Sequence, residues 1–553
     1  NPQGQYYDIF GGNNILSRLD EGGRTINDEK IFRLGAKVTL DLEEYVKGLS
    51  LTYSGNYSTR NGLKTERKKS VTNYDWYGDA SLGRNDETLL NSYVRLTTNE
   101  VDFQNHVLQA NYKRSIGKNN FAVLAGYTAE KSQSNRLFLS RSNLISDDLD
   151  DINTGDITTQ QTSGGSWSTG LTSYIGKFNY DFDGTYLLEA VGRRDGSSRL
   201  HPDFRWKNFF GGSAGVNLHK FSLISDLEVF DNLKLFGSYG ETGSVTGIGS
   251  YDYFSTIKTG STIFGSSPAQ YNTAYINGIT AIDRTWERVA TTNVGLDFTV
   301  LDRRLKGTVE VFNRVNNDML INVEYPDVLG GTAPKTNSGS FESNGWEVSL
   351  SWKDNVGDFK YNVGLMVWDS KSEITKLDGA TSINPGQNTT VEGKPLNSIF
   401  AYQTDGYLQN EQEVLEYYNS VGFVDPSDQT TMIDGSLLPA YRSANKLIPG
   451  SVRRVDTNGD GTITTDDLVY VGDANPHNSY GISIGMEYKG FDFSAFFQGV
   501  ANQNIVRTQT LSYPWRRWWQ NQNNTFIESS WTPENPSASQ PVISFNGSRN
   551  NWN

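Results

Sequence analysis

The chain has 553 residues, of which 36% are hydrophobic, 12% are aromatic and none is cysteine, and its formal net charge is −14. The acidic balance argues against nucleic acid as a partner, because phosphates require clustered Lys and Arg. The lack of cysteine excludes disulfides, thiolate metal sites and cysteine nucleophiles. No stretch approaches the roughly 20 consecutive apolar residues of a membrane helix, so this chain could cross a bilayer only with strands.

The strongest pattern along the chain is alternation of apolar and polar residues with a period of two, which predicts strands with two different faces. An apolar row runs from Leu34 to Leu42, and the other face of the same segment carries Arg33, Lys37, Thr39, Asp41 and Glu43. Similar rows recur over residues 49–57, 121–127, 174–182, 186–190, 233–239, 294–300, 305–311, 346–352, 359–367 and 482–495. Charged inner rows need water beside them, so the pattern favours a barrel with an apolar outer face and a wet interior.

The spacing of these rows predicts roughly 14–16 strands of about 10 residues, the length that crosses a bilayer at a tilt. Long polar connections are expected over residues 61–90, 131–170, 240–290 and 369–479. Short turns on one side and long loops on the other are typical of an all-β, transmembrane antiparallel β-barrel with long extracellular loops. Soluble β-sandwich or propeller domains are the alternative. They are disfavoured because sandwiches bury their apolar rows in one core and rarely sustain charged inner rows.

Near the end of the longest connection, residues 456–467 match the spacing of a calcium loop of EF-hand type. The candidate oxygen ligands are Asp456, Asn458, Asp460, the carbonyl of Thr462, and Asp467. Asp467 stands where such loops carry a bidentate Glu, and no flanking helix is evident. The prediction is a structural Ca²⁺ that braces an external loop, and the alternative is an Asx-rich turn that needs no metal.

The segment 515–520 gathers aromatic and cationic side chains. Trp515, Arg516, Trp518 and Trp519 could stack on sugar rings or contact a partner protein. Tryptophan belts are ordinary at membrane interfaces, so an interfacial anchor is the favoured interpretation of this segment.

One segment formally matches a catalytic motif. Gly211–Gly215 has the spacing of a nucleophile elbow, and His219 lies nearby. That motif requires a strand, a tight turn and a helix, whereas Val216 and Leu218 continue a strand alternation. The other histidines lack metal-ligand spacing, and no phosphate-binding glycine loop is present. The chain is therefore not expected to be an enzyme.

Five stretches along nearly the whole chain carry a family pattern. They are Tyr186–Ala190 leading into Arg194–Arg199, Leu233–Gly243, Trp286-Glu287 ahead of Asn293–Phe298, Tyr488–Gly499, and Trp531–Pro536. Taken jointly, they resemble the SusC/RagA family of TonB-dependent outer-membrane transporters. No single stretch would be specific.

The resemblance implies an outer-membrane barrel of about 22 strands, with a plug that contacts TonB and a SusD-like lipoprotein over its mouth. It also implies TonB-dependent import of oligosaccharides or peptides. Nothing in this chain resembles the plug or the TonB box. Residues 1–553 are therefore expected to be an internal fragment of the barrel, surrounded by outer-membrane lipids and lacking the plug and final strands, with 369–479 as a long extracellular loop region. The alternatives are a passive barrel that serves as an assembly platform, and a soluble adhesin.

Overall fold

The chain forms two compact units. The computed structural model describes residues 16, 19–20, 22–69, 71–76, 83–88, 92–146, 149–264, 269–276, 279–322, 328, 334–378, 388–423, 447–506 and 524–543. The first unit comprises Asn1–Asn217, Phe236–Ala290 and Pro326–Asn337, and the second comprises Leu218–Leu235, Thr291–Tyr325 and Ser338–Asn553. In the described part of the chain, no helix is both long and apolar enough to cross a membrane.

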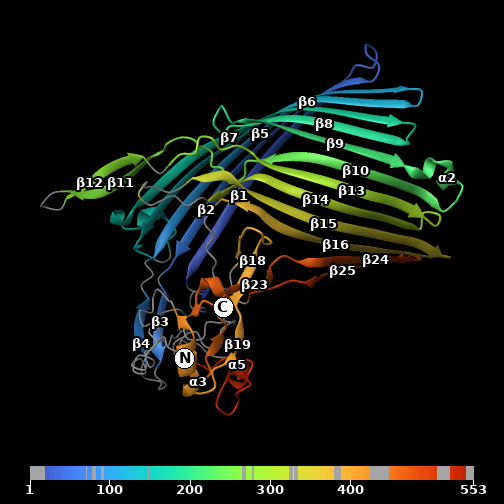
Figure 1. The fold of residues 1–553 in the computed structure, drawn as a ribbon. Helices are drawn as coiled ribbons and strands as arrows, with labels where there is room; N and C mark the ends of the chain where they lie inside the picture. Colours follow the sequence, from blue (N-terminus) through green and yellow to red (C-terminus); the bar gives the residue numbers. More distant parts are fainter. Residues whose placement is uncertain are drawn as a thin grey trace. The chain divides into compact units, whose positions relative to one another are not determined.

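Fourteen strands form one large sheet whose hydrogen-bonded order follows the order of the chain (Figure 1). They are β1 (Gly23–Asp41), β2 (Leu49–Lys68), β5 (Tyr93–Ile116), β6 (Asn119–Ser142), β7 (Gln161–Phe182), β8 (Tyr186–Ser197), β9 (Trp206–Asn217), β10 (Phe230–Ser244), β13 (Glu287–Val300), β14 (Leu305–Asn322), β15 (Lys335–Val356), β16 (Phe359–Leu377), β24 (His477–Tyr488) and β25 (Phe491–Asn502). Each pairing in this sheet with a described register is antiparallel. The all-β prediction and the strand count of roughly 14–16 are confirmed.

Strand register converts the sequence alternation into an apolar face. In the first unit, Val38, Tyr53, Leu108, Tyr127 and Tyr174 are cross-strand partners on successive strands. Cross-strand partners share a face of a sheet. These five side chains are 38% to 55% exposed, so they do not pack into a protein core. A continuous exposed apolar row of this kind suits contact with lipid.

The adjacent residues point to the opposite face, which is mainly polar. Lys37, Ser54, Thr128 and Ser173 lie in one cross-strand row, interrupted only by Val107. In the second unit the predicted rows also pair, because Trp352, Val363, Ile484 and Ala495 are successive cross-strand partners. The two-faced strand pattern therefore holds in both units.

Several strands continue well beyond their apolar rows. β2, β5, β6 and β7 have 20, 24, 24 and 22 residues. The expected length of about 10 residues is wrong for these strands, and residues 61–68, 131–142 and 161–170 are strand rather than connection. Hydrogen bonds between strands join backbone groups, so a strand can continue where the side chains on both of its faces are polar. Alternation of apolar and polar residues identifies only the part of a strand that has an apolar face.

The connections at the two ends of the strands differ in length. Short turns occupy residues 42–48, 117–118, 183–185, 301–304, 357–358 and 489–490, and the longest connections occupy 69–92, 143–160, 245–286 and 378–476. Two long connections contain hairpins, formed by β3 (Val71–Trp76) with β4 (Gly83–Thr88) and by β11 (Ile257–Phe264) with β12 (Ala269–Ile276). By the asymmetry of outer-membrane barrels, the long connections mark the extracellular end.

The connection 378–476 in the second unit has its own small core. Its elements are β17 (Asn388–Thr389), β18 (Ser398–Tyr402), β19 (Thr404–Tyr407), α3 (Glu411–Ser420), β20 (Gly422–Phe423), β21 (Val452–Arg454), β22 (Thr462–Ile463), the 3₁₀ turn η6 (Thr465–Asp467) and β23 (Leu468–Asp473). Helix α3 begins after Asn410, whose side chain accepts a hydrogen bond from the Glu413 N–H. The buried side chains of Leu408, Val414 and Tyr417 pack together, and burial raises the pKa of Tyr417 to about 12.

Candidate functional site

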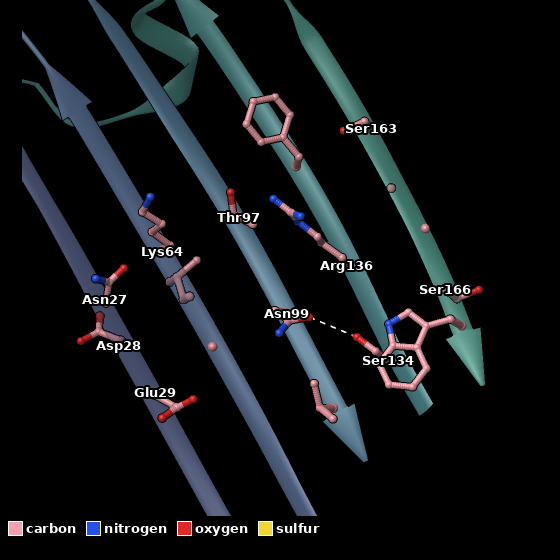
Figure 2. Close-up of a pocket in the computed structure, with 17 residues that line it drawn as sticks. Asn27, Asp28, Glu29, Lys64, Thr97, Asn99, Ser134, Arg136, Ser163 and Ser166 are labelled. Atoms are coloured by element: carbon pink, nitrogen blue, oxygen red, sulfur yellow. Dashed lines mark hydrogen bonds between the residues drawn. The ribbon is translucent and has the colours of Figure 1, made fainter. Parts of the chain in front are cut away.

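A polar groove lies on the first unit, on the face opposite the apolar row (Figure 2). Its central row is formed by Glu29, Gly62, Asn99, Arg136 and Gly165, which are successive cross-strand partners on β1, β2, β5, β6 and β7. Because the residues lie at matching positions, all five share one face of the sheet. The groove is therefore built by register across five strands rather than by any contiguous motif.

Two parallel rows border the central one. One row contains Asn27, Lys64, Thr97, Phe138 and Ser163, and the other contains Ile31, Arg60, Val101, Ser134 and Trp167. The resulting groove has a volume of about 1300 Å³. Its lining combines hydroxyl, amide, charged and aromatic groups, the mixture found in binding sites for polar ligands.

The central row is hollow because two of its five residues are glycines. Gly62 and Gly165 contribute no side chain, and a Cβ atom placed on Gly165 would have no atom within 4 Å. The larger neighbours Lys64, Phe138 and Trp167 therefore stand around an open floor. A ligand can approach the backbone of β2 and β7 at these two positions.

Two of the four charged residues that line the groove, Glu29 and Lys64, have charged partners. Glu29 lies 3.2 Å from Arg60, and Lys64 lies 2.8 Å from Glu66. The Ser134 hydroxyl donates a hydrogen bond of 3.2 Å to Asn99 Oδ1, which leaves the Asn99 amide N–H groups available. Within the described residues, Arg136 has neither an ion pair nor a hydrogen bond and is exposed.

The groove lies toward one end of its strands. Its residues on β2, β5, β6 and β7 are nearer the long connections 69–92 and 143–160 than the short turns 42–48 and 117–118. By the loop asymmetry, this is the extracellular half. A ligand arriving from outside would meet this groove before the part of the sheet near the short turns.

A second hollow of about 610 Å³ lies beside strand β7. Trp167 of this strand lines both the second hollow and the groove. The connection 245–286 forms its other side, where Arg284 and Asp252 make an ion pair of 3.0 Å. The Tyr251 hydroxyl accepts a hydrogen bond of 3.1 Å from the Ser168 N–H of β7. This bond and the ion pair fix the connection against the strand, so the two hollows form neighbouring parts of one unit.

The predicted calcium loop is closed by its own backbone. The Asp456 carboxylate accepts hydrogen bonds of 2.7 Å from the N–H groups of Gly459 and Gly461, and Asp460 Oδ1 accepts one of 2.7 Å from Thr462. Among the described residues, no three acidic or histidine side chains are grouped in a way that could hold a metal. Calcium binding by these residues and Asn458 stays a prediction.

Asp467 is the last residue of this loop and is fully buried. Its carboxylate accepts hydrogen bonds of 2.8 Å from the N–H groups of Thr457 and Thr464. Burial raises the pKa of Asp467, but the hydrogen bonds from Thr464, Thr457 and Asn458 lower it more, so the pKa lies below its ordinary value of 3.8. The Asp467 carboxylate therefore links the backbone at Thr457 and Asn458 to the backbone at Thr464.

Two other predictions concern residues 515–519 and the segment Gly211–Gly215. Trp515, Arg516, Trp518 and Trp519 lie outside the described residues. The segment Gly211–Gly215 lies inside strand β9, so it forms no nucleophile elbow. Sequence reasoning missed Arg136 and Trp167 because it assigned residues 131–170 to a loop. The alternation of Arg136 and Phe138 with Leu137 and Leu139 was the available signal.

The comparisons with known proteins agree with this architecture. No family model matches the chain. It is 25% identical over 452 residues to the TonB-dependent receptor P26 of Formosa agariphila, covering 78% of this chain and 42% of that protein. It is also 25% identical over 488 residues to the TonB-dependent receptor SusC of Bacteroides thetaiotaomicron, covering 84% and 41%. The chain is SusC/RagA-like.

Solved structures support the fold of this SusC/RagA-like chain. The RagAB peptide importer in its closed-closed state superimposes with a TM-score of 0.73 at 20% identity, covering 95% of this chain and 54% of that one. At this identity the likeness concerns the fold, an outer-membrane β-barrel. The chain spans about two fifths of the length of the curated relatives it matches. Both of these relatives are named as TonB-dependent receptors.

Proposed function

We propose that the SusC/RagA-like chain forms part of the barrel of a TonB-dependent importer, with the polar groove contacting the nutrient during its passage. The observation that carries the proposal is the pairing of an exposed apolar row on one face with a hollow polar groove on the other. Such a sheet separates lipid from a wet interior. The relatives are named TonB-dependent receptors, which supports TonB as the source of the energy for import.

The proposed nutrients are oligosaccharides or peptides, captured with a SusD-like surface lipoprotein. The RagAB structures are described as a peptide transporter, and SusC is a named relative. Purification of the full-length protein from its own outer membrane in mild detergent should yield a stoichiometric complex with a SusD-like lipoprotein. Recovery of the barrel protein by itself would contradict the proposed SusD-like partner. It would not decide whether the protein imports nutrients, which the uptake experiment tests separately.

Uptake in matched cells tests import directly. Cells that carry the full-length protein should take up labelled oligosaccharide or peptide, and deletion of TonB should remove that uptake. A passive barrel would keep it in cells without TonB, and an assembly platform would show no uptake in either strain. The protein level in the outer membrane is the control for both strains.

A further inference from the structure

We propose that Arg136 forms an anion subsite in the groove, and that the ligand is an oligosaccharide bearing a carboxylate. This inference deepens the proposed function and rests on it. It starts from the charges that line the groove, which are Asp28, Glu29, Lys64 and Arg136. Glu29 and Lys64 have partners, whereas Asp28 and Arg136 have none within the described residues.

Asp28 is too distant to neutralise Arg136. The two residues lie on β1 and β6, which are three strand spacings apart, or about 14 Å at roughly 4.8 Å per spacing. That separation exceeds the screening length of about 8 Å at physiological ionic strength. Arg136 therefore presents an uncompensated cation to the groove. Its guanidinium is a planar fork that fits a carboxylate with two parallel hydrogen bonds.

The surroundings leave room for that carboxylate. Gly165 is the cross-strand partner of Arg136 on β7. The space above Gly165 is open, because a Cβ atom there would have no atom within 4 Å. Figure 2 shows Arg136 between Thr97 and Asn99 of β5 and Ser163 of β7. An anionic group above the central row would meet the guanidinium with hydroxyl and amide groups on either side.

Aromatic and polar neighbours favour a sugar as the carrier of the charge. Trp167 is a diagonal neighbour of Arg136 in the β6–β7 register, at a separation of about 7–8 Å that large side chains bridge. Its indole offers a flat apolar surface to a sugar ring. The Thr97 hydroxyl and the free amide N–H groups of Asn99 can bind ring hydroxyls. These groups suit a hydroxyl-rich acidic ligand better than the apolar side chains of a peptide.

Binding measurements on the full-length protein in detergent test this subsite. The probes are a galacturonate tetramer, a neutral galactose tetramer of the same length, and a tetraglutamate peptide. Arg136→Ala should weaken galacturonate binding roughly tenfold, equivalent to about 1.4 kcal/mol, and leave the neutral sugar unchanged. Arg136→Lys should recover part of the loss, because it restores charge without the fork. Galacturonate affinity should also fall with added salt.

The matched control is Arg33→Ala. Arg33 is also exposed and unpartnered within the described residues. It lies on β1, on the same face of the sheet as Glu29, but it does not line the groove. This variant should bind galacturonate as the unmodified protein does. An equal loss in both variants would show a general effect of net charge and would overturn the subsite. Tryptophan fluorescence and thermal unfolding confirm that each variant is folded.

The remaining outcomes separate the two proposals. Galacturonate binding that is unaffected by Arg136→Ala, or absent from the unmodified protein, overturns the subsite. Binding of tetraglutamate in preference to galacturonate, with the same dependence on Arg136, overturns the sugar and assigns a peptide. Uptake in the TonB strains is measured independently, so TonB-dependent import with no effect of Arg136→Ala would preserve the proposed function and remove only this inference.

Discussion

Gly165 controls the shape of the groove at the level of a single residue. Gly165→Leu should fill the floor without a clash, because a side chain there begins in open space. Stability should change by no more than about 0.5 kcal/mol, while ligand affinity should fall about tenfold, or about 1.4 kcal/mol. Binding by calorimetry and thermal unfolding measure the two effects separately.

Gly176 provides the control for this substitution on the same strand. A Cβ atom on Gly176 would also meet no atom within 4 Å, but this residue lies on the apolar face, as the partner of Ala125. Gly176→Leu should leave ligand affinity unchanged. An equal loss of affinity in the two variants would contradict the placement of the ligand on the polar face.

Asp467 is expected to make the loop 456–467 sensitive to acid. Since its folded pKa lies below the ordinary value of 3.8, its contribution to stability is complete above that value and is lost as pH falls through the folded pKa. Asp467→Asn should reduce loop stability by about 1–3 kcal/mol at neutral pH, because one carboxylate oxygen is replaced by a donor facing backbone N–H groups.

Hydrogen exchange of the loop measures this effect at pH 6 and pH 3. Protection should fall at pH 3 in the unmodified protein and be low at both values in Asp467→Asn. Asp466→Asn is the control, because Asp466 is exposed beside it. Equal protection at both pH values in the unmodified protein would exclude Asp467 as the acid-sensitive group.

The loop 456–467, which contains Asp467, is also the predicted calcium-binding segment. If the loop binds Ca²⁺, millimolar calcium should slow its hydrogen exchange, and a chelator should reverse the effect. Asp456→Asn should abolish the response, because Asp456 is the first predicted ligand. Exchange that is identical with calcium and with chelator would assign the segment to an Asx-rich turn held by its backbone hydrogen bonds.

His477 joins three strands at the end of the connection 378–476. Its Nδ1 lies 2.9 Å from Asp369 of β16, and its Nε2 lies 3.3 Å from Asp473 of β23. His477→Phe should leave two nearly buried carboxylates without this partner and reduce local stability by about 1–3 kcal/mol. Limited proteolysis of the connection should become faster, whereas His106→Phe on β5 should have no effect on that region.

Across the whole molecule, the sequence predicted the features that repeat locally. Alternation identified the strands because an apolar face recurs every second residue, as from Leu34 to Leu42. It underestimated β6 and β7 because the runs 130–136 and 161–166 have no apolar side chain on either face. The turns 183–185 and 301–304 follow from the predicted rows on either side of them, 174–182 with 186–190 and 294–300 with 305–311.

The groove could not be derived in this way. Glu29 and Arg136 are 107 positions apart in the chain (136 − 29), and they share a row only because three strand pairings hold them in one register. A sequence pattern contains no information on pairings between strands joined by long connections. The hollow at Gly165 likewise depends on which residues face it.

The environment of the apolar face can be tested with one pair of substitutions on β5. Leu108 is 53% exposed on the apolar row, and Gln109 lies on the polar face beside it. On a soluble protein, Leu108→Arg would change stability by no more than about 0.5 kcal/mol. In a bilayer it should cost about 2 kcal/mol or more, because the charge would face hydrocarbon, whereas Gln109→Arg should be tolerated. Unfolding of the full-length protein in lipid vesicles measures both. A neutral Leu108→Arg would favour the soluble adhesin over a barrel surrounded by lipid.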